Sequence, residues 1–117
     1  MEWTVIHHPD FDAEFEDMSR AVRIELLAAT GLLELFGPML ARPHADTLSG
    51  SKHSNMKELR FVADDGVWRV AFAFDPKRRA VVLVAGDKAG AGQKRFYKTL
   101  IAKADARFAD HLEMLKG

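Results

Sequence analysis

The sequence of 117 residues contains no cysteine, so it can form no disulfide framework, no thiolate metal site and no cysteine nucleophile. It also has no apolar run approaching the roughly 20 residues that span a bilayer. The acidic N-terminus lacks the basic region and apolar stretch of a signal peptide. We therefore predict a single soluble domain over residues 1–117, in the cytoplasm and without membrane contact.

The chain also lacks net charge, because 17 Lys and Arg balance 17 Asp and Glu. The two signs are nevertheless segregated. Residues 1–50 carry nine acidic and three basic side chains, a net charge of −6, and residues 51–117 carry eight acidic and fourteen basic ones, a net charge of +6. A basic half on a neutral protein favours a surface for a polyanion. The alternative is that the two halves neutralise each other within the fold.

Three predicted strands, residues 56–63, 67–75 and 80–85, form the centre of the chain. The second strand alternates, with one face made by Trp68, Val70, Phe72 and Phe74 and the other by Arg69, Ala71 and Ala73. The third is a continuous apolar run, which is typical of a strand covered on both faces. We expect Asp64-Asp65-Gly66 to form a tight turn with the glycine at positive φ. Connections this short predict an antiparallel meander.

The first third of the chain predicts a short strand at residues 3–6 and then helix, because apolar residues recur at steps of three and four from Phe11 to Phe36. Ser19 marks a point where the helix could divide into two helices that form a hairpin. Further leucines widen the apolar surface of this region beyond one stripe. The extra surface either contacts a partner protein or is buried between the two helices. We interpret His7 and His8 as surface or capping residues, because no third metal ligand stands at a useful spacing. Residues 41–55 predict a polar loop, in which His44 and His53 could act as acid–base groups, although a lone histidine in a loop is more often simply solvated.

The last predicted helix, residues 93–115, has Lys94, Arg95 and Lys98 in its first turns. Cations there oppose the helix dipole, and an anionic ligand bound nearby would remove the conflict. The preceding segment, residues 87–92, resembles a phosphate loop only loosely and lacks the required spacing. We therefore predict no nucleotide cofactor and no metal.

Several segments taken together resemble the phage-derived HigB-like branch of the RelE/ParE toxin superfamily. They are Arg42-Pro43-His44, Ser51-Lys52, Asn55-Met56-Lys57-Glu58-Leu59-Arg60, Trp68-Arg69-Val70-Ala71-Phe72, Gly86-Asp87-Lys88 and Phe96-Tyr97-Lys98. The resemblance spans residues 41–115, and the N-terminal part matches in layout. It implies an α+β fold of the RelE type, in which an N-terminal strand and a helical hairpin pack on a small antiparallel sheet with a C-terminal helix. It also implies a toxin of a type II toxin–antitoxin pair that cleaves mRNA on the ribosome and that a small antitoxin holds inactive.

Metal-free RNA cleavage needs an activated ribose 2′-oxygen, stabilised phosphorane charge and a protonated leaving oxygen. Arginine suits the second task, and lysine or tyrosine with a shifted pKa could act as base or acid. The resemblance implies Lys57 and Arg60 as cations of the first central strand, and Arg69 as a phosphate clamp. It implies Lys88 and Tyr97 as further catalytic candidates. The expected RNA contacts are Lys52, Lys94, Arg95 and Lys98.

The strand pattern adds geometric expectations for these side chains. Arg60 and Arg69 lie on adjacent strands of one hairpin and can converge, and Ala71 beside Arg69 should leave room for RNA. Lys57 falls on the opposite face from Arg60 unless the strand bulges near Glu58. Tyr97 lies on the apolar stripe of the last helix, which fits a core role as well as a catalytic one.

The expected partners are the ribosome with its mRNA and an antitoxin that bears a helix-turn-helix, so that DNA is contacted only through the antitoxin. Two alternatives remain. One is a ParE-like toxin that acts without cleavage by binding a protein target such as a topoisomerase. The other is a degenerate family member that retains only antitoxin binding. The cluster of Lys57, Arg60 and Arg69 favours the nuclease, because a binding inhibitor needs no phosphorane-stabilising group.

Overall fold

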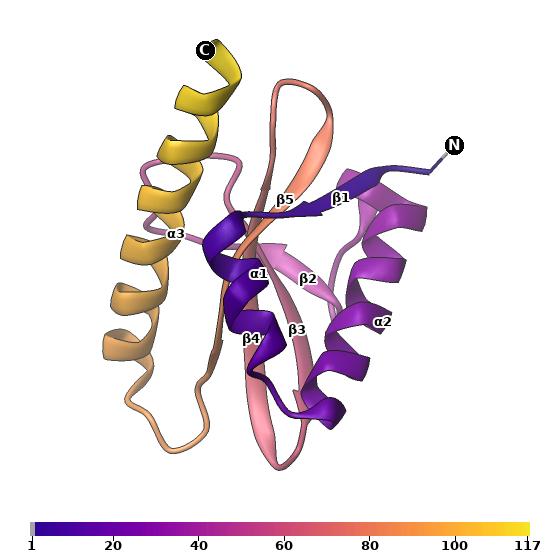
Figure 1. The fold of residues 1–117 in the computed structure, drawn as a ribbon. Coiled ribbons are helices and arrows are strands. Elements are labelled where there is room, and N and C mark those ends of the chain that lie inside the picture. Colours follow the sequence, from indigo (N-terminus) through magenta and orange to yellow (C-terminus); the bar gives the residue numbers. More distant parts are fainter. Residues whose placement is uncertain (1) are drawn as a thin grey trace.

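The computed structural model describes residues 2–117 and arranges them in three layers (Figure 1). The middle layer is a five-stranded sheet of order β1-β5-β4-β3-β2. Its strands are β1 (Thr4–His7), β2 (Ala45–Thr47), β3 (Lys57–Ala63), β4 (Gly66–Phe74) and β5 (Arg79–Asp87). Helices α1 (Pro9–Glu16) and α2 (Arg20–Phe36) pack on one face, and α3 (Gln93–Lys116) packs on the other. The predicted α+β fold is confirmed.

The centre of the sheet is the predicted antiparallel meander of β3, β4 and β5. Strand β1 adds to it by pairing in parallel with β5, so the complete sheet is mixed. Side chains of β5 alternate between two cores, as expected for a strand covered on both faces. Ala80 and Val82 pack under α1 and α2, whereas Val81 and Leu83 pack under α3.

The helical hairpin divides where the sequence indicated. Ser19 is the N-cap of α2, and its hydroxyl oxygen accepts a hydrogen bond from the backbone N–H of Val22 at 3.3 Å. Gly37 ends α2 at a φ of 54° and lies against the Trp3 ring, where a Cβ would clash. His8 is the N-cap of α1 and is buried, so the capping interpretation is confirmed.

The turn between β3 and β4 differs from the prediction. It consists of Asp64 and Asp65 alone, and these two residues have the positive φ values, 53° and 61°. Aspartate tolerates this conformation because its short side chain can bond nearby backbone. Gly66 begins β4 and is needed for another reason: a Cβ there would lie 2.7 Å from a side-chain oxygen of Asp87.

The predicted loop at residues 41–55 was wrong in part, because Ala45–Thr47 forms β2 and pairs with β3. This strand has three residues and a polar sequence, so no alternation reveals it. Its paired residues on β3 lie ten to fourteen positions further along the chain, and the pairing therefore depends on the tertiary fold. Ala45 is buried in the core under α1 and α2, and Leu48 is buried in the core under α3.

Arg107 links helix α3 to both α1 and β5. Its guanidinium donates two hydrogen bonds of 2.7 Å to the carboxylate of Glu14 on α1 and one of 2.8 Å to the carbonyl oxygen of Leu83 on β5. The hydrogen bond from Arg107 holds the pKa of Glu14 below its usual value, against the effect of burial. This contact joins α3 to α1 across the end of the apolar packing between α3 and β5.

The apolar surface expected beyond the buried stripe of α2 is present. Ile24, Leu27 and Leu35 are each more than half exposed, and Met39 beyond the helix is 83% exposed. No helix within residues 2–117 has the length and hydrophobicity to cross a membrane.

Candidate active site

Arg60 on β3 and Arg69 on β4 are direct partners in the strand register, so their side chains leave the same face of the sheet. Glu58, two residues before Arg60, shares this face. Its Oε2 atom lies 3.8 Å from Nε of Arg60 and 3.9 Å from Nε of Arg69. The sequence-based expectation that the two arginines converge is confirmed, and a buried carboxylate lies between them.

Arg69 is only 6% exposed, because α3 covers this face of the sheet. Its Nη1 donates to the carbonyl oxygen of Trp68 at 2.9 Å, and its Nε donates to the hydroxyl of Tyr97 at 3.3 Å. Ala71 is fully buried and does not leave the open space that the sequence suggested. The side chain of Arg69 is therefore held in a fixed direction by its neighbours.

Tyr97 and Lys88 meet beside this pair. The Nζ atom of Lys88 lies 5.8 Å from the centre of the Tyr97 ring. Burial, together with the carboxylate of Glu58, raises the pKa of Tyr97, and Arg69 only partly opposes this effect. A tyrosine hydroxyl with a raised pKa keeps its proton at neutral pH. It can therefore donate a proton to a leaving oxygen and is poorly suited to act as a base.

A groove of about 540 Å³ opens in front of Arg60 and Arg69, lined also by Arg42, Pro43, His44, Phe61, Val62 and Val67. Arg42 and Arg60 share the carboxylate of Asp46, at 2.6 Å and 3.9 Å from its Oδ2 atom. The hydrogen bond from Arg42 holds the pKa of Asp46 below its usual value. Three arginines surround the carboxylates of Glu58 and Asp46, so the groove carries a net positive charge. This charge is suited to binding the phosphate groups of a nucleic-acid backbone.

Lys57 does not join this cluster. Strand β3 pairs with β4 without a register shift, so Lys57 lies on the opposite sheet face and is the partner of Phe72. The one irregularity in the meander falls between Ala71 and Phe72, where β4 pairs with β5. The bulge near Glu58 that would have united Lys57 with Arg60 is absent from the described strand.

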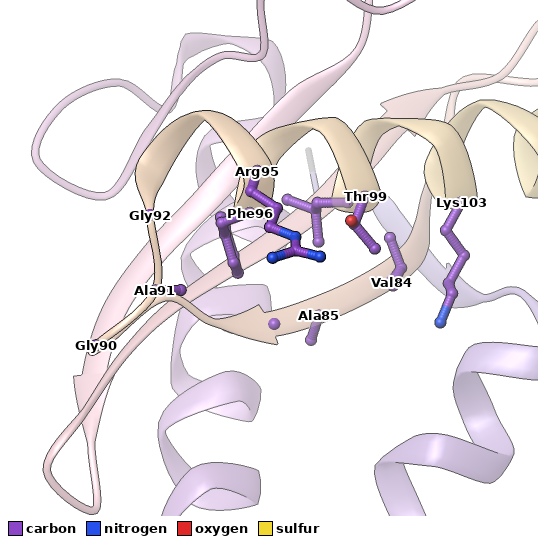
Figure 2. Close-up of a pocket in the computed structure, with 11 residues that line it drawn as sticks. Val84, Ala85, Gly90, Ala91, Gly92, Arg95, Phe96, Thr99 and Lys103 are labelled. Atoms are coloured by element: carbon purple, nitrogen blue, oxygen red, sulfur yellow. The ribbon is translucent and has the colours of Figure 1, made fainter.

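The predicted RNA contacts lie outside the groove and are exposed. Lys52 follows Ser51, and its backbone N–H donates to Asp105 of α3 at 3.0 Å. Lys94, Arg95 and Lys98 lie on the first turns of α3, on the same helix as Tyr97. None of these four cations lines the groove of Arg60 and Arg69, and Arg95 instead lines a separate pocket between α3 and β5 (Figure 2).

Glu58 was not a predicted site residue, although its position two residues before Arg60 could have indicated that the two side chains lie together. Residues i and i+2 of a strand share a face, so Glu58 and Arg60 had to lie together once the strand was recognised. Its Oε1 atom is buried and has no hydrogen-bond partner in the part of the chain that the structure describes. The groove residues Arg42 and His44 depend on β2, which was missed.

We expect Glu58→Gln to lower the free energy of unfolding by about 3 kcal/mol, because the buried Arg69 loses its counter-charge. Urea unfolding at pH 7 measures this change. Glu2→Gln, an exposed substitution of the same kind, serves as the control and should change stability by less than about 0.5 kcal/mol. Equal stability of the two variants would show that Glu58 does not balance the arginine pair.

No cluster of three or more His, Asp or Glu side chains suited to a metal ion occurs within residues 2–117. The polar side chains of the site are arginines, the phenol of Tyr97, the imidazole of His44 and the carboxylates of Glu58 and Asp46, which the arginines contact. Such a set binds anions and transfers protons, and it offers no group of oxygen ligands that would hold a divalent cation.

Comparison with protein families matches residues 13–109 to a family described as phage-derived protein Gp49-like. Two proposed toxins of Mycobacterium tuberculosis are similar in sequence. HigB3 is 43% identical over 113 residues, which cover 97% of this chain and 96% of HigB3. HigB2 is 47% identical over 88 residues, which cover 74% of this chain but only 43% of HigB2.

Among solved structures, the Escherichia coli toxin RelE in the free state, with two arginines replaced by alanine, is similar in fold, with a TM-score of 0.62. The superposition covers 88% of this chain and 97% of that structure, at 12% sequence identity. At this identity the likeness concerns the fold, and it agrees with the sheet and helix arrangement described above.

Proposed function

The chain belongs to the phage-derived Gp49-like family, and from that premise we propose that it is the toxin of a toxin–antitoxin pair and cleaves mRNA on the ribosome without a metal ion. The observation that carries the proposal is the pairing of Arg60 and Arg69 on one sheet face beneath Tyr97, at the wall of a basic groove. This arrangement supplies the charge stabilisation that phosphodiester cleavage needs.

In the proposed reaction, the ribose 2′-oxygen attacks the adjacent phosphorus atom and the bond to the 5′-oxygen breaks. Arg60 and Arg69 bind the non-bridging oxygens, whose negative charge increases in the phosphorane. Tyr97 donates its proton to the leaving 5′-oxygen, in keeping with its raised pKa. His44, whose imidazole lines the same groove, takes the proton of the 2′-hydroxyl.

Inhibition by a partner is part of the proposal. A protein that cleaves cellular mRNA must be neutralised in the cell that makes it, and the HigB relatives point to a cognate antitoxin. We propose that antitoxin, toxin and ribosome meet in the cytoplasm, with residues 1–117 acting as one toxin domain.

The test is cleavage of mRNA on translating ribosomes with the purified protein, mapped by primer extension. We expect cuts within the ribosomal A site. Lys77→Ala, which removes an exposed cation from the turn between β4 and β5, is the matched control and should cleave normally. Growth arrest in cells without any cleavage in this assay would overturn the nuclease and favour inhibition of a protein target.

A further inference from the structure

The outer face of α2 carries a second apolar stripe, which no other segment of the described chain covers. Helical spacing puts Ile24, Leu27, Ala28, Gly31 and Leu35 on this face, opposite the side chains that pack on the sheet. We call these five residues the outer stripe. A Cβ added at Gly31 would meet no neighbouring segment within 4 Å, and Figure 1 shows α2 at the margin of the molecule, away from α3.

The charges of α2 are arranged against its own helix dipole. Its first turn contains Arg20 and Arg23 and no acidic residue, and its last turn contains Glu34 and no basic residue. Because a helix is positive at its N-terminal end and negative at its C-terminal end, both arrangements are unfavourable within one copy. They become favourable when a second helix lies antiparallel alongside, since its C-terminal end then lies beside the two arginines.

Arg23 and Glu34 lie along one flank of the outer stripe, about three helical turns apart. Neither side chain forms an ion pair within residues 2–117. The Nε atom of Arg23 is buried and has no hydrogen-bond partner in that part of the chain. Arg23 is therefore a half-buried cation without a counter-charge, which an approaching carboxylate would stabilise.

We propose that the outer stripe is a dimer interface, in which α2 of one copy packs antiparallel on α2 of a second copy about a two-fold axis near Ala28. This axis places Arg23 opposite Glu34 of the partner subunit, so the contact contains two equivalent ion pairs. The small Ala28 and Gly31 let the helix axes approach closely where they cross, and the larger apolar side chains of the stripe pack on either side.

The charge pattern selects a second copy in this one orientation. A parallel pair of α2 helices would place Arg23 against Arg23 and Glu34 against Glu34, and like charges would repel. Nucleic acid is a poor occupant, because the stripe is apolar and its flank carries a carboxylate as well as a cation. The face is complementary to itself under a two-fold rotation, as the interface of a symmetric dimer must be.

The proposed dimer leaves the candidate active site free. Helix α2 packs on one face of the sheet, and Arg60 and Arg69 leave the other face, on the side of α3. The groove of the two arginines therefore lies across the sheet from the dimer contact. One helix per copy makes a small interface, so we expect a dissociation constant on the order of 10 μM.

Sedimentation equilibrium of the complete chain, at concentrations that bracket this value, is the first test. We expect a reversible equilibrium between monomer and dimer. Leu27→Glu puts a charge on the apolar stripe from an exposed position and should abolish the dimer with the fold intact. Glu34→Arg should weaken the dimer at least about tenfold, because both ion pairs become like-charge contacts.

An exchange of charges tests the ion pairs directly. The double variant Arg23→Glu with Glu34→Arg should dimerise at least about fivefold more tightly than Glu34→Arg alone, because opposite charges face each other again. The exchange also suits the dipole of each helix, so the double variant should fold. Glu113→Arg, on the exposed side of α3 across the sheet, is the matched control and should leave the equilibrium unchanged.

Because the chain contains no cysteine, cross-linking by introduced thiols gives a second test. Ala28→Cys places two thiols beside the axis, and we expect an intermolecular disulfide under mild oxidation. Leu35→Cys should form none, because an antiparallel pair separates these positions by about 20 Å, beyond the reach of a disulfide. Ala106→Cys, at an exposed position of α3, measures cross-linking by random collision.

Three results would overturn the dimer proposal. One is a chain that stays monomeric and cross-links no faster at Ala28→Cys than at Ala106→Cys, which would leave the outer stripe to an unrelated partner protein. Another is a dimer that survives Leu27→Glu and therefore uses another surface. The third is a disulfide in Leu35→Cys, which would show a parallel pair. Assembly is measured without ribosomes, so loss of mRNA cleavage would contradict the nuclease alone.

Discussion

Replacing Arg69 by alanine should reduce mRNA cleavage on the ribosome by about two to three orders of magnitude, the usual cost of losing one donor to transition-state charge. Arg69 is held by the carbonyl of Trp68 and the hydroxyl of Tyr97, so its guanidinium is oriented before substrate binds. A preoriented donor needs no reorganisation at the moment of reaction. Single-turnover cleavage, mapped by primer extension, measures the loss.

Because Arg69 is buried beside Glu58, the alanine variant could fail to fold. Arg69→Lys keeps the positive charge and removes the planar fork, so it should fold and still lose at least about tenfold in rate. Circular dichroism and urea unfolding establish that each variant is folded. Arg78→Ala, an exposed arginine in the turn between β4 and β5, is the matched control. Wild-type cleavage by folded Arg69→Lys and Arg69→Ala would remove Arg69 from the site.

Asp75→Ala should cost about 3 kcal/mol of stability, the largest loss that we expect from a single side chain outside the active site. The Asp75 carboxylate is fully buried. It accepts hydrogen bonds from the backbone N–H groups of Lys77 and Arg79 at 2.9 Å and 3.0 Å, and from Nε of Arg79 at 3.0 Å. It also meets Nε2 of His111 on α3 at 2.9 Å. Its removal leaves these donors without a partner and loosens the contact between the turn and α3.

The same carboxyl predicts how stability depends on pH. Burial alone would raise the pKa of Asp75, but hydrogen bonds from His111 and Arg79 outweigh it and lower the pKa below its usual value. A lowered pKa in the folded state contributes stability above the unfolded pKa of about 4, and this stability is lost as pH falls through the folded value. Asp75→Asn should therefore flatten the decline in stability at acidic pH.

Urea unfolding between pH 3 and pH 7 tests this dependence. Asp64→Asn is the control, because Asp64 is exposed in a turn where asparagine also tolerates positive φ. The control should follow the wild-type curve. If Asp75→Asn also ran parallel to the wild type at all pH values, the hydrogen bonds to Asp75 would not be a source of acid sensitivity.

Much of the fold could be predicted because the relevant patterns are local. The alternation in β4 assigned Val70 and Phe72 to one face and Arg69 and Ala71 to the other, and the two cores agree with it. Helical spacing with a capping Ser19 gave the hairpin of α1 and α2. By contrast, β2 and the parallel pairing of β1 involve partners distant in sequence, for which a three- or four-residue strand carries no readable pattern.

The candidate site, like the fold, could be predicted only where its residues lie on one local strand pattern. Strand alternation brought Arg60 and Arg69 together and separated Lys57 from them, and the register agrees on both points. It could not show that α3 lies over Arg69, that Tyr97 bonds to it, or that Arg42 and His44 complete the groove. Those contacts depend on how a helix and a loop pack against the sheet.

The sequence by itself determined the central meander, the division of the helical hairpin, the basic second half and the family to which the chain belongs. Side-chain periodicity and turn residues act over a few positions, so these features are present in the order of the amino acids. Only the tertiary structure decided which helix covers the two arginines, which carboxylate lies between them and whether the outer stripe of α2 is buried or exposed. Each of these depends on packing between segments far apart in the chain, where burial and charge pairing over the whole fold select one arrangement.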